Sequence, residues 1–400
     1  MDPVRNPYSP GAGSPPPALV GRDSEREGFD IAVRRLVSGR PARSLMLTGL
    51  RGVGKTVLLH EFGRIARGHE WIHQHIEAAE DTRFPDALAM LTRRTLLQLS
   101  ARQRLADQGR RALGVLKSFQ LRWNLPDGGS LDVAIDPVPG VADSGALEDD
   151  LADLFLEVAQ AARDRQVGVL FTVDEIQFLA REHLAALIVG LHRISQEQLP
   201  LIVAGAGLPS LPALAGEAKS YAERLFTFPV IGSLDQTEAM AALATPAGEE
   251  GVRWEDEALA LVIEETKGYP YFLQEFGKQA WDVAQDGRSI RKDDVEAAIP
   301  VAVNELDTGF FRVRIDRTTD AERAYLRAMA ELGEGPYSSG KVAAAMGRTT
   351  PQVGPLRDAL IKRGLCYSPR HGVIAFTVPM FDQFVRRWPE VGPTSRPSAL

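Results

Sequence analysis

Apolar residues between positions 19 and 234 occur in short runs separated by longer segments in which they recur every three or four residues. The short runs have strand length and lie at 44–49, 71–78, 167–173, 201–206 and 226–231. The longer, helix-like segments lie at 24–37, 55–67, 85–99, 147–163 and 183–198. Strands that alternate with helices pair in parallel and are covered on both faces. The pattern therefore predicts an α/β domain with a five-stranded parallel sheet.

Two local signals refine this domain. Ser24 and Glu27 have the spacing of a capping box, so we expect the first helix to begin at Ser24. The segment FQLRWNLPDGGSLDVAIDP, at 119–137, has two alternating runs around a Pro-Asp-Gly-Gly turn. It predicts a β-hairpin inserted into the α/β domain.

The rest of the chain is predominantly helical in pattern. Candidate helices at 236–243, 255–265, 271–284 and 292–299 predict a helical lid over 235–309. Beyond the lid, the pattern predicts a winged helix-turn-helix over 310–390. Its expected elements are helices at 320–332 and 338–346, a third helix ending near Arg363, two strand-like pieces at 365–369 and 373–378, and a helix at 381–388. Because proline is tolerated in the first turn, we place the start of the third helix near Gly354, with Pro355 at its first position.

Composition bounds the class of protein. The 400 residues are 44% hydrophobic and 25% charged, which suits two or three folded domains: an α/β domain at 19–234, the lid and the winged helix. Proline-rich ends predict solvated tails at 1–18 and 391–400. No apolar run is long enough to cross a membrane, no signal peptide is evident, and Cys366 is the only cysteine, so we expect a cytoplasmic protein without disulfides.

Charge is distributed unevenly along the chain. Residues 310–400 carry 14 lysines and arginines against 8 acidic residues, a net charge of +6, whereas residues 1–309 have a net charge of −13. A basic module joined to an acidic one suits a nucleic-acid-binding function, although helical domains also vary by a few charges without such a role.

The clearest chemical motif is GLRGVGKT, in which Gly49, Gly54, Lys55 and Thr56 match G-x-x-x-x-G-K-[ST] between a strand and a helix. Glycines let the backbone N–H groups of such a loop surround phosphates, while the lysine supplies charge and the threonine hydroxyl can ligate Mg²⁺. We expect this loop to bind a nucleoside triphosphate.

A pair of acidic residues ends the third apolar run. Asp174 would hold Mg²⁺, and Glu175 would orient and deprotonate the attacking water. Acidic residues are also favoured at a helix N-terminus, but the upstream phosphate loop favours the catalytic interpretation. The additional strand at 201–206 indicates a hydrolytic P-loop protein and disfavours a simple nucleotide kinase.

Several motifs occur in a characteristic order: LVGRDSE at 19–25, GLRGVGKT, VDEIQFL at 173–179, YAERLF at 221–226, GYPYFLQ at 268–274 and a terminal winged-helix pattern. The sequence in this respect resembles the AAA+/STAND-type P-loop ATPases related to the origin-recognition complex and the archaeal ATPases, over residues 20–390. The resemblance implies an ATP-binding protein that hydrolyses ATP to ADP and phosphate and acts as a nucleotide-gated DNA-binding regulator, with duplex DNA and either a second copy of the chain or another protein as expected partners. The alternative is a signalling or scaffold ATPase whose winged helix and hairpin bind protein partners.

The resemblance also assigns residues. Those expected to contact the nucleotide are Val20, Gly21, Arg22, Gly49, Gly52, Val53, Gly54, Lys55, Thr56, Val57, Gly268 and Pro270. Arg224 corresponds to an arginine that stabilises the γ-phosphate, in its own or a neighbouring chain, unless it is simply a solvated surface arginine. The strand end at which such ATPases place a polar sensor reads Ala-Gly-Ala-Gly here, at 204–207. The lid helix begins Pro270-Tyr271-Phe272, where origin-recognition relatives often have an arginine that acts as a second sensor. Slow turnover is the expected consequence.

Other candidates are weaker. His73 and His75 share one strand face, but no cysteine or third histidine is near them in sequence, which disfavours a metal site. Cys366 is expected to be a core thiol. In the third C-terminal helix, the residues predicted to contact duplex DNA are Arg348, Thr350, Gln352, Arg357, Lys362 and Arg363. Winged helices also dock on proteins, so DNA binding and protein binding both remain open.

Overall fold

The computed structural model describes residues 1–400 except 12, 80–82, 102–106, 126–134, 286 and 389–400. Contacts between Cα atoms divide the chain into two compact units. The sheet unit comprises Ser9–Pro246 and Lys267–Tyr271, and the C-terminal unit comprises Met1–Tyr8, Ala247–Thr266 and Phe272–Leu400. Each unit is described by itself.

The sheet unit contains a five-stranded parallel sheet in the order β2-β3-β4-β1-β5. Its strands are β1 (Ser44–Thr48), β2 (Ile72–Glu77), β3 (Val169–Asp174), β4 (Leu201–Gly207) and β5 (Phe226–Thr227). Every residue of β1, β3 and β4 is buried, which explains why these strands have unbroken apolar runs and no alternation. The predicted fold class is confirmed, with β4 inserted between β1 and β3.

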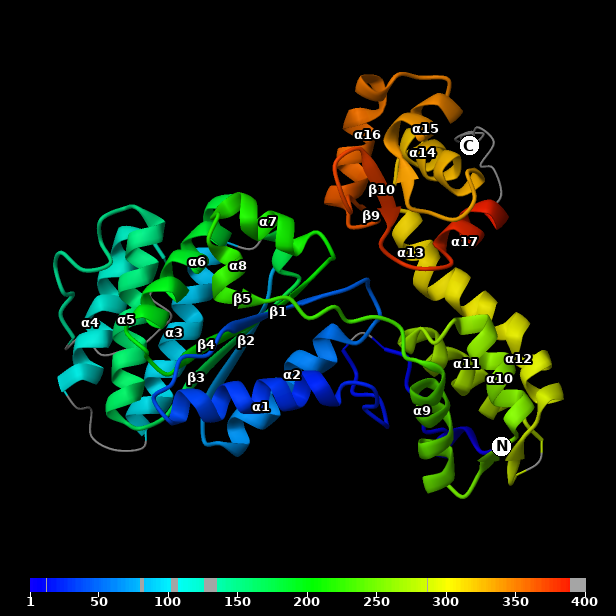
Figure 1. Cartoon of the computed structure of the whole chain (residues 1–400), viewed down its shortest axis with the longest axis horizontal. Coiled ribbons are helices and arrows are strands. Elements are labelled where there is room, and N and C mark those ends of the chain that lie inside the picture. Colours follow the sequence, from blue (N-terminus) through cyan, green and yellow to red (C-terminus); the bar gives the residue numbers. More distant parts are fainter. Residues whose placement is uncertain (12, 80–82, 102–106, 126–134, 286, 389–400) are drawn as a thin grey trace, which may run out of the picture. The chain divides into compact units, whose positions relative to one another are not determined.

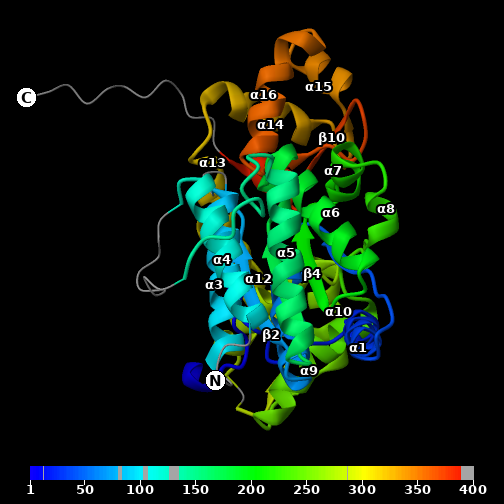
Figure 2. The ribbon, with the colours of Figure 1, turned by 90° about the vertical axis from the view of Figure 1, so that its left-hand side faces the viewer.

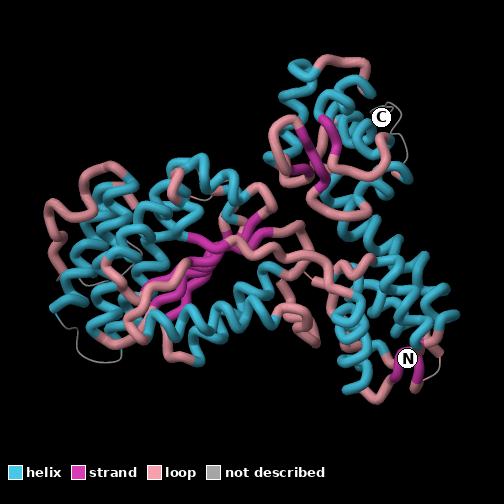
Figure 3. Tube along the Cα trace, in the orientation of Figure 1, coloured by secondary structure: helices cyan, strands magenta, loops and turns pink. Residues whose placement is uncertain are grey.

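Helices cover both faces of the sheet. The helices of this unit are α1 (Asp23–Val37), α2 (Lys55–Gly68), α3 (Phe84–Ala101), α4 (Asp107–Arg122), α5 (Leu147–Asp164), α6 (Arg181–Gln196), α7 (Leu211–Ala218) and α8 (Ala222–Leu225), with a 3-10 turn η2 (Ile176–Phe178) after β3. Figure 1 shows α1 and α2 on one face and α3 to α6 on the other. Figure 2 shows α3, α4 and α5 side by side, and Figure 3 shows the strands enclosed between these helical layers.

The predicted hairpin at 119–137 is wrong over its first part, where residues 119–122 end helix α4. Ala112, Val115, Leu116 and Phe119 recur at helical spacing on α4 and are buried, so the four residues at the helix end resembled a strand only by chance. The Pro-Asp-Gly-Gly turn and the following residues through 134 lie outside the described residues. The first helix begins at Asp23, one residue earlier than expected, and Ser24 does not cap it.

Helix α9 (Gln236–Glu249) runs from the sheet unit into the C-terminal unit. The C-terminal unit then contains α10 (Asp256–Thr266), α11 (Pro270–Val283, whose first two residues belong to the sheet unit), α12 (Lys292–Glu305), the π-helical turn η3 (Leu306–Phe311), α13 (Arg312–Ile315), α14 (Asp320–Glu331), α15 (Ser339–Ala345), α16 (Thr350–Lys362) and α17 (Phe381–Arg387). Strands β6 (Arg253–Trp254) and β7 (Ser289–Ile290) pair in parallel, and β8 (Tyr337–Ser338), β9 (Cys366–Tyr367) and β10 (Val373–Phe376) form an antiparallel sheet in the order β8-β10-β9.

The predicted start of the third C-terminal helix is wrong. Helix α16 begins at Thr350, because Thr349 and Gln352 form a capping box, and Pro355 lies inside the helix. A proline there removes only one backbone hydrogen bond near the helix start. Cys366 is fully buried, as expected for a core thiol.

Residues 1–8 are not a solvated tail, contrary to the prediction from their prolines. The turn η1 (Pro3–Arg5) is followed by Tyr8, which is 3% exposed. The Tyr8 hydroxyl accepts a hydrogen bond of 2.7 Å from Trp254 Nε1, and Asn6 Nδ2 donates to Asp282 Oδ1 at 2.8 Å. Burial of one aromatic ring and these polar contacts attach the segment to the C-terminal unit.

Candidate functional site

The predicted phosphate loop connects the carboxyl end of β1 to the first residue of α2. Gly52 and Gly54 have φ angles of 86° and 92°, a left-handed region that favours glycine. In the described part of the chain, the backbone N–H groups of residues 52–57 donate to no protein acceptor. A set of free N–H groups at a helix N-terminus fits a phosphate group.

Lys55 is folded onto this loop. Its side chain Nζ donates to the carbonyl oxygens of Gly49 at 3.0 Å and Leu50 at 2.8 Å, and the residue is only 8% exposed. Burial lowers the pKa of Lys55 to about 8, against the attraction of Glu175 and Asp174, which favours the charged form. The loop carbonyls therefore solvate the ammonium group that phosphate oxygens would bind.

Thr56 and Asp174 meet where β1 and β3 end. The Thr56 hydroxyl donates to Asp174 Oδ2 at 2.5 Å, and Asp174 Oδ1 accepts from the Glu175 backbone N–H at 2.8 Å. Asp174 is 5% exposed. A hydroxyl beside a carboxylate is the donor set that Mg²⁺ takes in phosphate-loop proteins, so these two residues fit that ion.

Glu175 follows with φ 49°, a left-handed conformation unusual for glutamate. Its carboxylate Oε2 lies 3.7 Å from Arg51 of the phosphate loop and accepts a hydrogen bond from Gln177 Nε2. The sequence argument missed both partners. Arg51 occupies a variable position of the loop motif, and Gln177 lies only two residues after the acidic pair, which is the one signal that could have found it.

The nucleotide-site residues predicted outside the loop lie beside it. Tyr269 donates its hydroxyl proton to the Arg51 carbonyl oxygen, and the Tyr271 N–H donates to the Gly52 carbonyl at 3.2 Å. Gly268, with φ 68°, accepts from the Leu234 N–H at 2.9 Å. The segment at 267–271, which includes Gly268 and Pro270 and joins α10 to α11, is thus hydrogen-bonded to the phosphate loop.

Arg22, another residue expected to contact the nucleotide, is bonded to three backbone carbonyl groups. Its guanidinium donates to the carbonyl oxygens of Gly21 at 2.8 Å, Val53 at 3.3 Å and Gly232 at 2.6 Å, and burial lowers its pKa. These bonds connect the phosphate loop to the segment after β5. The structure thus places Arg22 beside Val53, with its guanidinium bound to backbone carbonyls.

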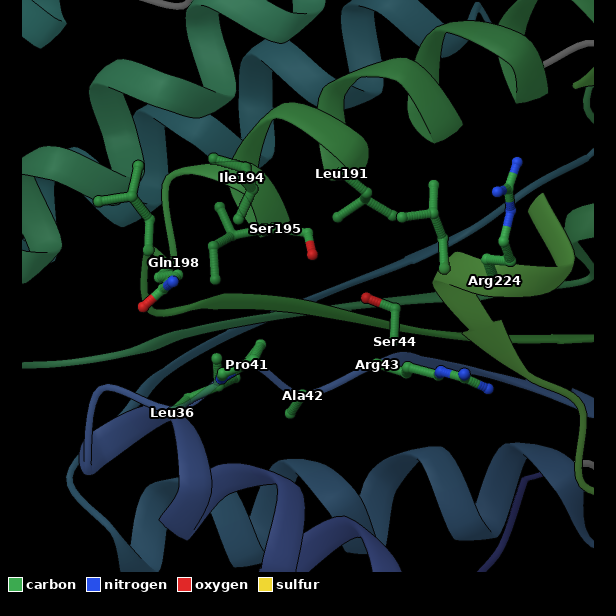
Figure 4. A pocket seen from close by; sticks show the side chains of 13 residues that line it. Leu36, Pro41, Ala42, Arg43, Ser44, Leu191, Ile194, Ser195, Gln198 and Arg224 are labelled. Carbon is green, nitrogen blue, oxygen red and sulfur yellow. The ribbon is translucent and has the colours of Figure 1, made fainter. Parts of the chain in front are cut away.

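Arg224 lies at the opposite edge of the sheet. It belongs to α8, directly before β5, and Phe226 is paired with Ser44 at the amino end of β1, whereas the phosphate loop follows the carboxyl end of that strand. Figure 4 shows Arg224 and Arg43 at one end of a pocket with Ser44 between them. Both arginines are exposed. The structure therefore separates Arg224 from the phosphate loop of its own chain.

His73 and His75 meet at the hydroxyl of Thr172, at 2.8 Å and 2.9 Å respectively. The ring of His60 lies 5.1 Å from that of His75, between centroids. Burial lowers the pKa of His73 to about 4, and Arg67 contributes in the same direction. Among the described residues, no group of three or more histidine, cysteine or acidic side chains is arranged to hold a metal ion.

The predicted DNA-binding residues fall into two sets. Arg348, Thr350 and Lys362 are exposed, and their side chains bond to no described residue; Gln352 and Arg363 are exposed too, but they have such bonds. Gln352 caps its own helix through Oε1, Arg357 donates to Ser368 at 2.9 Å, and Arg363 pairs at 3.1 Å with Glu322, whose side chain is 4% exposed. The second set has contacts within the unit that stabilise the fold.

No helix in the described ranges combines the length and apolar character needed to cross a membrane. Residues 18–204 match the family described as the AAA ATPase domain, and residues 308–385 match a domain of unknown function, DUF8462. No curated protein matches the chain by sequence.

Two solved structures share the fold over nearly the whole chain. A Walker-type ATPase of Pyrococcus abyssi has a TM-score of 0.55 and 16% identity, with 92% of this chain and 96% of that chain covered. The ORC2 protein of Aeropyrum pernix, solved in ADPNP–ADP complexes, has a TM-score of 0.53 and 18% identity, with 94% and 95% covered. Residues 18–204, which hold the phosphate loop and the acidic pair, thus match the AAA ATPase domain, and the chain has the fold of the P-loop NTPases.

Proposed function

We propose that the protein binds Mg²⁺-ATP, hydrolyses it slowly, and uses the bound nucleotide to control the binding of duplex DNA. The observation that carries the ATPase part is the convergence of the free loop N–H groups, Lys55, the Thr56–Asp174 pair and Glu175 at one edge of the sheet. Phosphate oxygens would replace the two carbonyl oxygens that Lys55 now contacts. Glu175 would accept a proton from the attacking water.

We propose three domains in chain order: an ATPase domain at 19–234, a lid at 235–309 and a winged helix at 310–390. The segment at 267–271 supports coupling between nucleotide and lid, because Tyr269 and Tyr271 bond to the two loop carbonyls of Arg51 and Gly52. A loop that rearranges around phosphates would change these bonds and so move the connection between α10 and α11. We place this activity in the cytoplasm, in keeping with the single, buried cysteine.

The DNA part rests on two observations. The net charge of residues 310–400 is +6, and α14 to α16 followed by the strands β9 and β10 have the element order of a winged helix-turn-helix. Exposed Arg348, Thr350 and Lys362 on and beside α16 would contact DNA. The internal contacts of Gln352, Arg357 and Arg363 favour the second candidate, a protein-docking winged helix, because they reduce the number of available polar groups.

Duplex binding by the full chain at several salt concentrations distinguishes the two functions. We expect affinity that falls steeply with salt and that differs between ATP and ADP. Lys362→Ala should reduce the slope of log K against log salt by about one if Lys362 contacts a phosphate, whereas Lys292→Ala, outside α16, should leave it unchanged. Failure to bind duplex at low salt in every nucleotide state would exclude the DNA function and leave the protein-docking candidate.

A further inference from the structure

Gln177 lies in the 3-10 turn η2 (Ile176–Phe178), directly after the acidic pair, and both its amide nitrogen and its amide oxygen form hydrogen bonds. Its Nε2 donates to Glu175 Oε2. Its Oε1 accepts a hydrogen bond of 3.1 Å from the backbone N–H of Leu208, the residue after β4. One side chain therefore connects the proposed catalytic carboxylate to the carboxyl end of the neighbouring strand.

The end of β4 has room for the Gln177 amide because residue 207 is glycine. A Cβ atom at Gly207 would lie 2.8 Å from Gln177 Oε1 and 3.1 Å from Ile176 Cγ2, closer than side chains normally approach. Residues 204–207 are alanine and glycine, so this strand end presents no polar side chain to the site. The Gln177 amide occupies the space that a side chain at Gly207 would need.

The contacts of Glu175 are one-sided. Gln177 and Arg51 both approach Oε2, and no described residue bonds to Oε1. A carboxylate held through one oxygen keeps the other available to accept a proton from water.

We infer that Gln177 is a positioning residue for ATP hydrolysis, which holds the Glu175 carboxylate and ties it to the end of β4. The inference rests on the proposed ATPase function. In the reaction, Glu175 takes one proton from water, the water oxygen bonds to the γ-phosphorus, and the bond between that phosphorus and the bridging oxygen of ADP breaks. Gln177 touches none of the reacting atoms and acts only through Glu175.

Steady-state phosphate release and equilibrium binding of a fluorescent ATP analogue test this role. Gln177→Ala should lower kcat about tenfold or more, as part of the 10²–10⁴-fold contribution of a general base, and leave the analogue Kd unchanged. Gly207→Ala should act in the same way, because the added methyl group displaces the amide. Gln196→Ala, at the exposed end of α6, is the matched control with wild-type kcat.

Two further variants separate positioning from support of the fold. Gln177→Glu keeps the acceptor for the Leu208 N–H but cannot donate to Glu175, so it should be as slow as Gln177→Ala. In the double variant with Glu175→Gln, loss of Gln177 should cause no additional decrease, because its partner is already gone. A Gln177→Glu protein with wild-type kcat, a multiplicative loss in the double variant, or a Gln177→Ala protein as fast as wild type would overturn the inference.

The same measurements distinguish failure of the underlying function. If the wild-type chain binds the analogue but Glu175→Gln leaves its turnover unchanged, the proposed catalytic role of Glu175 is wrong, and the inference about Gln177 is wrong with it. If Glu175→Gln abolishes turnover and the Gln177 and Gly207 variants do not lower it, only the inference is wrong.

Discussion

Replacement of Arg224 by alanine tests whether this arginine acts on the nucleotide bound by a neighbouring copy of the chain. The register pairs Phe226 with Ser44 at the amino end of β1, and the phosphate loop begins five residues later, at Gly49. At about 3.3 Å per residue, the two edges of the sheet are separated by about 16 Å, which is longer than an arginine side chain. Arg224 cannot reach the nucleotide of its own chain, so a catalytic role requires a neighbouring copy.

The expected magnitude follows from this geometry. An arginine supplied to a phosphoryl-transfer site accelerates it by about 10³–10⁵-fold, so Arg224→Ala should be almost inactive. A mixture of Arg224→Ala and Glu175→Gln chains in equal amounts contains sites with an intact Glu175 next to an intact Arg224. In a head-to-tail assembly with random exchange, about one quarter of the sites are complete, and turnover should recover to about one quarter of the wild-type rate.

Phosphate release by each variant alone, by the mixture and by wild type over a range of protein concentrations measures this effect. Wild-type activity per chain should rise with concentration. Arg43→Ala, at the same end of the pocket, shows whether general loss of charge at this edge is sufficient to lower the rate. The reasoning is refuted by a mixture that stays inactive although both variants bind ATP and assemble, or by full activity of Arg224→Ala alone.

Three other outcomes are expected. Lys55→Ala should abolish binding of a fluorescent ATP analogue, because it removes the cation facing the β- and γ-phosphates, while Lys292→Ala should bind normally. His73 is neutral in the folded state because burial lowers its pKa to about 4, whereas the unfolded chain takes up a proton on this histidine once the pH falls below the usual histidine pKa. The free energy of unfolding by urea should therefore fall by up to about 2 kcal/mol from pH 7 to pH 5. His73→Gln should make the free energy of unfolding depend less on pH over this range. Arg363→Ala should lower the free energy of unfolding by about 2 kcal/mol, because it leaves the buried Glu322 carboxylate without its charged partner and with the Thr319 N–H as its hydrogen-bond donor, whereas Lys362→Ala should change it by less than about 0.5 kcal/mol.

Sequence reasoning succeeded where local signals and tertiary packing agree. The strand runs at 44–49, 167–173 and 201–206 are short, apolar and separated by amphipathic segments, and the structure buries them in one parallel sheet. Gly52 and Gly54 of the loop both have positive φ, and the motif itself specifies glycine at the second of these positions. The convergence of Thr56 and Asp174 follows, because Asp174 ends β3 and Thr56 comes just after the loop that leaves the carboxyl end of β1, a strand parallel to β3 in the same sheet.

The predictions of secondary structure and solvation were wrong where the local sequence pattern was short, or where a contact with a residue distant in sequence determined the structure. Four residues of α4 imitated an alternating strand, although Ala112, Val115 and Phe119 before them have helical spacing. The prolines near the N-terminus suggested solvation, but the buried bond between Tyr8 and Trp254 joins residues 246 positions apart. No pattern local to either residue predicts such a contact.

Gln177 and Arg51 show the same limit at the site. Nothing in the sequence singles out either residue. Their relevance to the site comes from their contacts with the Glu175 carboxylate, which the fold places beside both side chains. The absence of a polar residue at the end of β4 is visible in the sequence. That the Gln177 side chain, from the turn after β3, lies there instead is not, because this depends on the space left by Gly207.

The central claim, that the chain is an ATPase whose water-activating group is Glu175, is tested most directly by a comparison of wild-type and Glu175→Gln proteins in one experiment that records both ATP binding and phosphate release. The account predicts equal affinity for ATP in the two proteins, slow phosphate release by wild type, and a rate at least about tenfold lower in Glu175→Gln. Equal rates of phosphate release from two proteins that bind ATP equally well would contradict it.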